Sequence, residues 1–186
     1  MTDPAHSLDV RIHGLWRSVH SFTRAGEEVG ILSVERGSKG LVKGGRYVPS
    51  KGEVLSIRRD PGLLRSQFSL WTEGQEWLGA SLRWSVLQRE IVLHTPSKEL
   101  RIQPLPGLRC GWSLRAAKTG EMARVLGRPL ARRARIEVYR RIDPELVVFT
   151  YFLGSQIMIE SLWPGPAAAN DLPEAAGTSR AGGPGP

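Results

Sequence analysis

The chain has 186 residues, 40% of them hydrophobic, which is long enough for one domain with a core of its own. It contains a single cysteine, Cys110, so an internal disulfide framework and a cysteine-based zinc site are excluded. The N-terminus lacks the basic and then apolar run of a secretory signal, so we expect a cytoplasmic protein. The net charge of +8 favours anionic partners.

The two ends of the chain differ in composition from its middle. Residues 1–8 are polar and show no periodic pattern. Residues 164–186 are rich in Pro, Gly and Ala, and such a segment cannot bury enough apolar surface to offset the entropy lost on ordering. We therefore predict a disordered N-terminus over 1–8, one domain over 9–163 and a disordered tail over 164–186.

A strand–turn–strand pattern occurs three times, with Gly followed by Glu or Gln at the tip, at Gly26, Gly74 and Gly120. Glycine adopts the positive φ that tight hairpin turns require, so we expect it to have this conformation in each turn. The copies are 48 and 46 residues apart, which suggests a closed or radially repeated all-β structure. Trp71 and Trp77 flank the second turn and could pair across strands.

Short strand-like segments fill the intervals between these hairpins. The candidates are Val10–Leu15, Arg46–Val48, Val54–Arg58, Leu82–Leu87, Ile91–His94, Leu100–Gln103 and Arg135–Arg140. With the hairpins they make about ten to twelve strands. We predict a mainly β fold, a closed antiparallel barrel of about twelve strands, because closure removes exposed sheet edges.

The glycine-rich stretch from Arg36 to Gly45 invites comparison with a loop that cradles phosphate. It lacks the spacing of that motif, and no helix follows it on which a phosphate could sit. We therefore predict a flexible hairpin loop in which Lys39 and Lys43 are surface charges.

A helix is predicted over 144–162. Asp143 can cap it, Pro144 is tolerated at the first position, and Glu145 suits the positive end of the helix dipole. The four apolar residues 146–149 face every direction around a helix axis, as in a core helix or a membrane span. Because a charged side chain such as Glu160 inside a span costs about 3 kcal/mol, we predict a core helix and keep membrane insertion as the alternative.

An antiparallel barrel filled by an apolar C-terminal helix resembles the tubby C-terminal-like superfamily, which includes phospholipid scramblases and LURP-one-related proteins. The resemblance covers 10–163 and is carried by the three Gly hairpins, the return strands Glu28-Val-Gly-Ile and Trp77-Leu-Gly-Ala, and the segment Asp143–Leu153. It implies a twelve-stranded barrel around a central helix, without enzymatic activity and often acting at membranes or on lipids. The chain lacks the cysteine-rich and acidic segments of scramblases, so calcium-dependent scrambling is not expected.

An arginine-rich segment provides the clearest candidate binding residues. Seven arginines and one acid lie between 124 and 141. Guanidinium groups bind phosphate bidentately, so this segment could hold an anionic phospholipid. The candidates are Arg124, Arg128, Arg132, Arg133, Arg135, Arg140 and Arg141. The alternative is a solvated outer face of the last strand, with Ile136 and Val138 facing inward. Arg58 and Arg59 are a weaker second candidate.

The four histidines show neither metal-ligand spacing nor a catalytic motif, so we predict no enzyme, no metal site and no cofactor. We expect a cytoplasmic, monomeric domain that associates with anionic phospholipid or membrane surfaces as a peripheral protein. The alternatives are a basic nucleic-acid-binding barrel and a protein-interaction scaffold.

Overall fold

The computed structural model describes residues 3–14, 18–37, 42–60, 67–81, 90–106, 111–127 and 132–158. Over these residues, twelve antiparallel strands each pair with the next, and β1 pairs with β12 to close a barrel. The strands are β1 (His6–His13), β2 (Val19–Arg24), β3 (Glu27–Arg36), β4 (Val42–Pro49), β5 (Leu55–Arg59), β6 (Phe68–Thr72), β7 (Trp77–Ser81), β8 (Ile91–His94), β9 (Glu99–Pro104), β10 (Gly111–Ala116), β11 (Gly120–Leu126) and β12 (Arg133–Val138).

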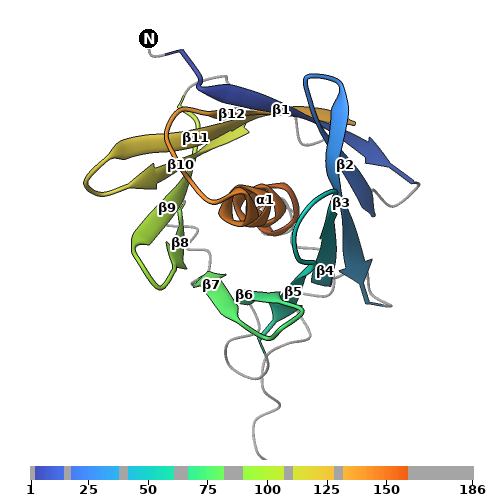
Figure 1. Cartoon of the computed structure of the whole chain (residues 1–186). Coiled ribbons are helices and arrows are strands. Elements are labelled where there is room, and N and C mark those ends of the chain that lie inside the picture. The colour runs from blue at the N-terminus through green and yellow to red at the C-terminus, as the bar shows by residue number, and fades with distance from the viewer. Residues whose placement is uncertain are drawn as a thin grey trace, which may run out of the picture.

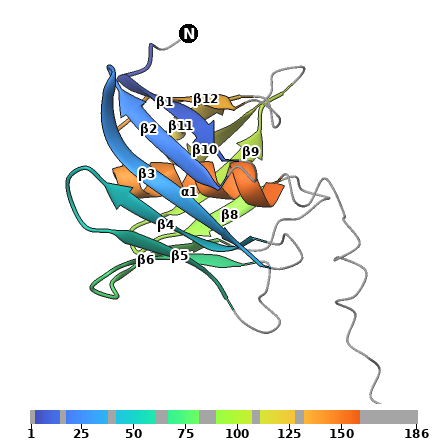
Figure 2. The ribbon, with the colours of Figure 1, turned by 90° about the vertical axis from the view of Figure 1, so that its right-hand side faces the viewer.

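The helix α1 (Pro144–Phe152) lies inside the ring of strands, as Figure 1 shows along the barrel and Figure 2 from the side. Every residue from Leu146 to Leu153 is buried, which requires apolar contacts on all sides of the helix. The strands supply them through alternate inward side chains, such as Leu55 and Ile57 of β5. The predicted closed barrel around a hydrophobic C-terminal helix is confirmed.

The helix begins at Pro144 as predicted, but it differs from the prediction in two details. Asp143 occupies the capping position without a side-chain capping hydrogen bond; its carbonyl oxygen accepts the amide of Leu146 at 3.0 Å. The α-helical geometry ends at Phe152, and a π-helix, η2, continues over Leu153–Met158. The predicted end, 159–162 with Glu160, lies outside the described residues. Nowhere in the described chain is a helix long and apolar enough to cross a bilayer.

Because consecutive strands are antiparallel, the three predicted hairpins all lie at the end of the barrel where α1 begins. Gly26 and Gly120 have positive φ, 89° and 75°, as predicted. At the middle hairpin the positive φ of 64° belongs to Gln75, so the prediction for Gly74 is wrong. The turn there is held instead by Thr72, whose hydroxyl accepts the Glu76 amide at 3.1 Å.

Two predicted boundaries need correction. Strand β1 begins at His6 and pairs with β12 from that residue, so the domain starts before residue 9; backbone pairing does not need an apolar side-chain pattern. The glycine-rich stretch is a strand from Val42 onward, and the predicted loop is correspondingly shorter. Lys39, the candidate strand Leu82–Leu87 and the tail 164–186 lie outside the described residues.

Candidate functional site: a basic pocket on the barrel wall

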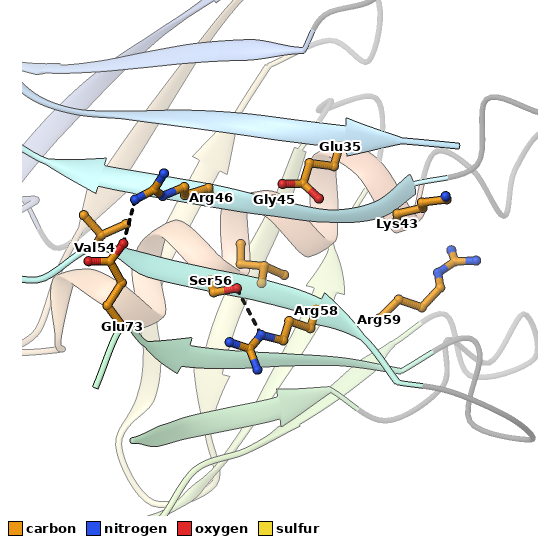
Figure 3. A pocket seen from close by; sticks show the side chains of 10 residues that line it. Glu35, Lys43, Gly45, Arg46, Val54, Ser56, Arg58, Arg59 and Glu73 are labelled. Carbon is orange, nitrogen blue, oxygen red and sulfur yellow. Dashed lines mark hydrogen bonds and ion pairs between the residues drawn. The ribbon is translucent and has the colours of Figure 1, made fainter. Parts of the chain in front are cut away.

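A pocket of about 480 Å³ lies on the outer face of the barrel across β3, β4 and β5 (Figure 3). We call it the basic pocket. Its charged lining residues are Glu35 of β3, Lys43 and Arg46 of β4, Arg58 and Arg59 of β5, and Glu73, which follows β6. Four basic groups against two carboxylates leave an excess of two positive charges at this place.

Two consecutive glycines of β4 lie beside the pocket, and the second of them, Gly45, lines it. Gly44 pairs with Arg58 of β5, and a Cβ at Gly44 would run into the carbonyl oxygen of Ile57. Gly45 faces the interior, where a Cβ would lie 3.3 Å from the ring of Phe152. The missing side chain at Gly44 therefore lets β4 approach β5 closely and leaves no bulk opposite Arg58.

The basic groups of the pocket differ in how far they are neutralised. Arg46 forms an ion pair with Glu73 at 2.6 Å, and both side chains are well exposed. Arg58 donates from Nε to the hydroxyl of Ser56 at 3.2 Å, and its guanidinium lies 5.9 Å from the centroid of the Trp71 ring. In the part of the chain that the structure describes, no carboxylate forms an ion pair with Lys43 or Arg58.

Arg59 stands at the edge of the barrel core. Its guanidinium lies 4.9 Å from the ring centroid of Phe68, a fully buried residue of β6. Figure 3 shows Lys43 and Arg59 at one end of the pocket and the Arg46–Glu73 pair at the other. Ammonium and guanidinium groups arranged in this way can donate several charge-assisted hydrogen bonds to one phosphate-like anion.

The arginines predicted from the sequence do not form one cluster. Arg124 of β11 donates to Glu121 at 2.6 and 3.1 Å and lies 5.4 Å from the ring centroid of Tyr139. Its hydrogen bond to Glu121 raises the pKa of Arg124. Burial, and then a hydrogen bond to Glu137 at 2.6 Å, raise the pKa of Tyr139 to about 12. Arg124 therefore belongs to a locally neutralised network.

The other predicted arginines are spread along β12. Arg135 donates to the hydroxyl of Ser7 at 3.3 Å, while Arg132 and Arg133 are exposed at the beginning of the strand. Arg133 pairs with Arg11 of β1, which places two positive side chains opposite each other. Ile136 and Val138 face inward, as the solvated-face alternative predicts.

Arg140 and Arg141 are exposed after the other end of β12, and the strand itself is roughly 17 Å long at about 3.3 Å per residue. Arg128 lies outside the described residues. The exposed arginines at the beginning of β12, together with Arg11, form a second basic surface, which we call the β1–β12 surface.

Comparison with known proteins shows a likeness of fold. No family model matches this chain, and no curated protein matches it. The X-ray structure of a protein from Arabidopsis thaliana superposes with a TM-score of 0.55, covering 87% of this chain and 93% of that chain at 12% sequence identity. The two proteins share a fold. At this identity the likeness carries nothing about ligand or activity.

Sequence reasoning named part of the basic pocket and missed the rest. It gave Arg58 and Arg59 as a second candidate and treated Lys43 as a surface charge, while the role of Arg46 and Gly44 was not seen. The available signal was the glycine pair between Lys43 and Arg46. Its meaning depends on the register of β4 against β5, which places Gly44 beside Arg58.

Proposed function

We propose that this chain is a non-enzymatic domain of the tubby-like, LURP-one-related type that binds the phosphate groups of anionic phospholipids through the basic pocket. The observation that carries the proposal is the grouping of Lys43, Arg58 and Arg59 in one pocket, where Gly44 lets β4 approach β5 closely. The barrel closed on an apolar helix supports the family part, because this is the architecture that the sequence resemblance implies.

A phosphate ligand fits the pocket better than a neutral ligand. The positive groups exceed the carboxylates, and two of the bases are left without an ion-pair partner among the described residues. Binding an anion would relieve the repulsion among these like charges. The net charge of +8 adds a long-range attraction to anionic surfaces, which raises the rate of encounter.

The test is binding of the full chain to phosphatidylserine/phosphatidylcholine vesicles by co-sedimentation. Basic groups near an anionic membrane contribute about 1 kcal/mol each, so Lys43→Gln with Arg58→Gln should weaken binding at least about tenfold. The matched control is Arg115→Gln with Lys118→Gln, which removes the same charge from β10 and its hairpin. Because β10 lies six strands from β4, on the opposite side of the barrel, this control variant should bind the vesicles as tightly as the original chain does.

Two results would contradict parts of the proposal. Equal binding to vesicles with and without phosphatidylserine would remove the lipid function. If Arg132→Glu with Arg133→Glu abolishes vesicle binding while the pocket variant still binds, the lipid-binding site is the β1–β12 surface and not the basic pocket.

A nucleic-acid-binding barrel stays the alternative, because a basic surface attracts any polyphosphate. It predicts retention on nucleic acid with an affinity that falls steeply with salt. A filter-binding assay without retention at low salt would remove it, while tight retention together with failed vesicle binding would replace the lipid proposal.

A further inference from the structure

The wall of the barrel that holds the basic pocket also holds exposed apolar side chains. In the described part of the chain, the exposed large hydrophobic residues are Val48 of β4, 47% exposed, and Trp77 of β7, 36% exposed. A single exposed apolar residue is ordinary in a folded protein. Here both lie on the β4–β7 wall, at the lower side of the ring in Figure 1.

Strand register joins the basic and the apolar groups into one surface. Arg46 pairs with Ser56, Ser56 with Trp71, and Trp71 with Trp77, so one row crosses from β4 to β7. The predicted cross-strand pairing of Trp71 and Trp77 is thereby confirmed. Val48 follows Arg46 two residues later, on the same face of β4. Three strand spacings separate β4 from β7, about 14 Å.

Side-chain chemistry along this row changes from cationic to aromatic. The indole N–H of Trp71 donates to the hydroxyl of Ser69 at 2.9 Å, which satisfies the polar atom of that side chain. Trp77 and Val48 lie toward the end of the barrel where α1 begins, and Lys43, Arg58 and Arg59 toward the other end. One wall thus presents phosphate-binding groups and exposed apolar groups to the same partner.

We infer that the β4–β7 wall is the face that rests on an anionic bilayer, with Trp77 and Val48 entering the boundary between headgroups and acyl chains. The inference rests on the proposed function and deepens it by naming the face of the barrel that meets the membrane and the apolar side chains that enter it. A small phosphate compound in solution offers nothing to cover Trp77 and Val48. A bilayer offers phosphates and apolar surface side by side, and tryptophan favours that boundary because its ring is apolar and its N–H is polar.

The experiment uses the full chain with phosphatidylserine/phosphatidylcholine vesicles whose acyl chains carry bromine, which quenches tryptophan fluorescence at short range. We expect quenching in the original chain and loss of most of it in Trp77→Phe, which keeps an aromatic ring at the same position. The variant with Trp77→Ser and Val48→Ser should bind the vesicles at least about tenfold more weakly, because the exposed 36% of Trp77 and 47% of Val48 no longer provide apolar surface for the membrane to bury. It should bind glycerophosphoserine, the headgroup without acyl chains, as the original chain does.

The outcomes separate the inference from the proposed function. If the vesicles bind the chain but quenching is the same in Trp77→Phe, the inference is overturned and the lipid function stands. Equal affinity for glycerophosphoserine and for vesicles would also overturn it, because the membrane would then contribute nothing. Failure to bind anionic vesicles at all would remove the proposed function itself. Stacking of nucleic-acid bases on Trp77, seen as quenching by single-stranded DNA without vesicle binding, would overturn both.

Discussion

Arg58 and Arg124 each lie beside an aromatic ring, but among the described residues only Arg124 forms an ion pair with a carboxylate. Glu121 holds Arg124 through two hydrogen bonds, whereas Arg58 contacts the neutral hydroxyl of Ser56. A sequence shows how many arginines a segment has, but the partner of each one depends on strand register and side-chain direction. The arginine-rich segment around β12 was therefore an incomplete guide to where positive charge is available.

Tyr47 gives a prediction at the same scale. It lines a cavity of about 290 Å³ at the end of the barrel where α1 begins, and its hydroxyl donates to the Val29 carbonyl at 3.2 Å. Burial, and then the nearby Glu145 carboxylate, raise the pKa of Tyr47 to about 12. In the unfolded chain the pKa is about 10. Since folding favours the neutral phenol, its stabilisation is complete below about pH 10 and is lost as pH rises toward 12.

The measurement is urea unfolding of the original chain and of Tyr47→Phe across this alkaline range. A pKa raised from about 10 to about 12 corresponds to roughly 3 kcal/mol of stabilisation. Between about pH 10 and 12 the free energy of unfolding of the original chain should therefore fall by on the order of 2 kcal/mol more than that of the variant. Tyr139 is present in both proteins and cancels in the comparison. Parallel pH profiles for the two proteins would show that the Tyr47 phenol titrates normally in the folded state.

At the scale of elements, local patterns predicted strands and turns because alternation of apolar residues and turn chemistry act over a few residues. The pairing of Trp71 with Trp77 followed from the hairpin between them. The basic pocket could not follow in this way, because it depends on how Gly44 of β4 meets Arg58 of β5 across a separate connection. The misassigned turn at Gly74 has a different, local reason. The Thr72 hydroxyl accepts the Glu76 amide, and Gln75 rather than Gly74 has the left-handed conformation.

The hairpins differ in how they should respond to alanine. Gly120 has a φ of 75°, which an alanine adopts with strain, so Gly120→Ala should lower the free energy of unfolding by about 1 kcal/mol. Gly74 is outside the positive-φ region, and a Cβ there would make an ordinary contact of 3.6 Å with Thr72 Oγ1. Gly74→Ala should therefore be neutral or stabilise by about 0.4–1 kcal/mol. Urea midpoints test the pair; the reverse order would contradict this account of the turns.

At the scale of the whole molecule, the fold was predictable because an apolar helix and many short strands can satisfy one another in few ways. A helix that buries every residue from Leu146 to Leu153 needs contacts around its full circumference. Strands in turn need partners on both edges, and a closed ring meets both requirements. The surface has no comparable constraint, since solvated charges can be placed anywhere on it. For this reason the closed barrel around a core helix was predicted, although some of its boundaries were not, and the site was predicted only in part.

Residues 6–8, which the sequence pattern assigned to a disordered segment, take part in closing the barrel. The ring closes where β1 pairs with β12, from His6 opposite Val138 to Arg11 opposite Arg133, and the Ala5 amide donates to the Val138 carbonyl at 2.8 Å. Deleting residues 1–4 leaves all of these pairs in place and should not change the free energy of unfolding.

Deleting residues 1–9 removes four of these pairs with β12, from His6 to Asp9. The second half of β12, which precedes α1, then has no strand paired with it on the β1 side. At about 0.5–1.5 kcal/mol for each lost hydrogen bond, the cost should be several kcal/mol, a large share of the stability of a domain of this size. Urea unfolding followed by near-ultraviolet circular dichroism compares the two deletions with the full chain. Equal midpoints for all three would mean that the first half of β1 contributes nothing to closure. A loss confined to the longer deletion would place the start of the domain at the first residues of β1, because backbone pairing can order a segment whose side chains give no signal.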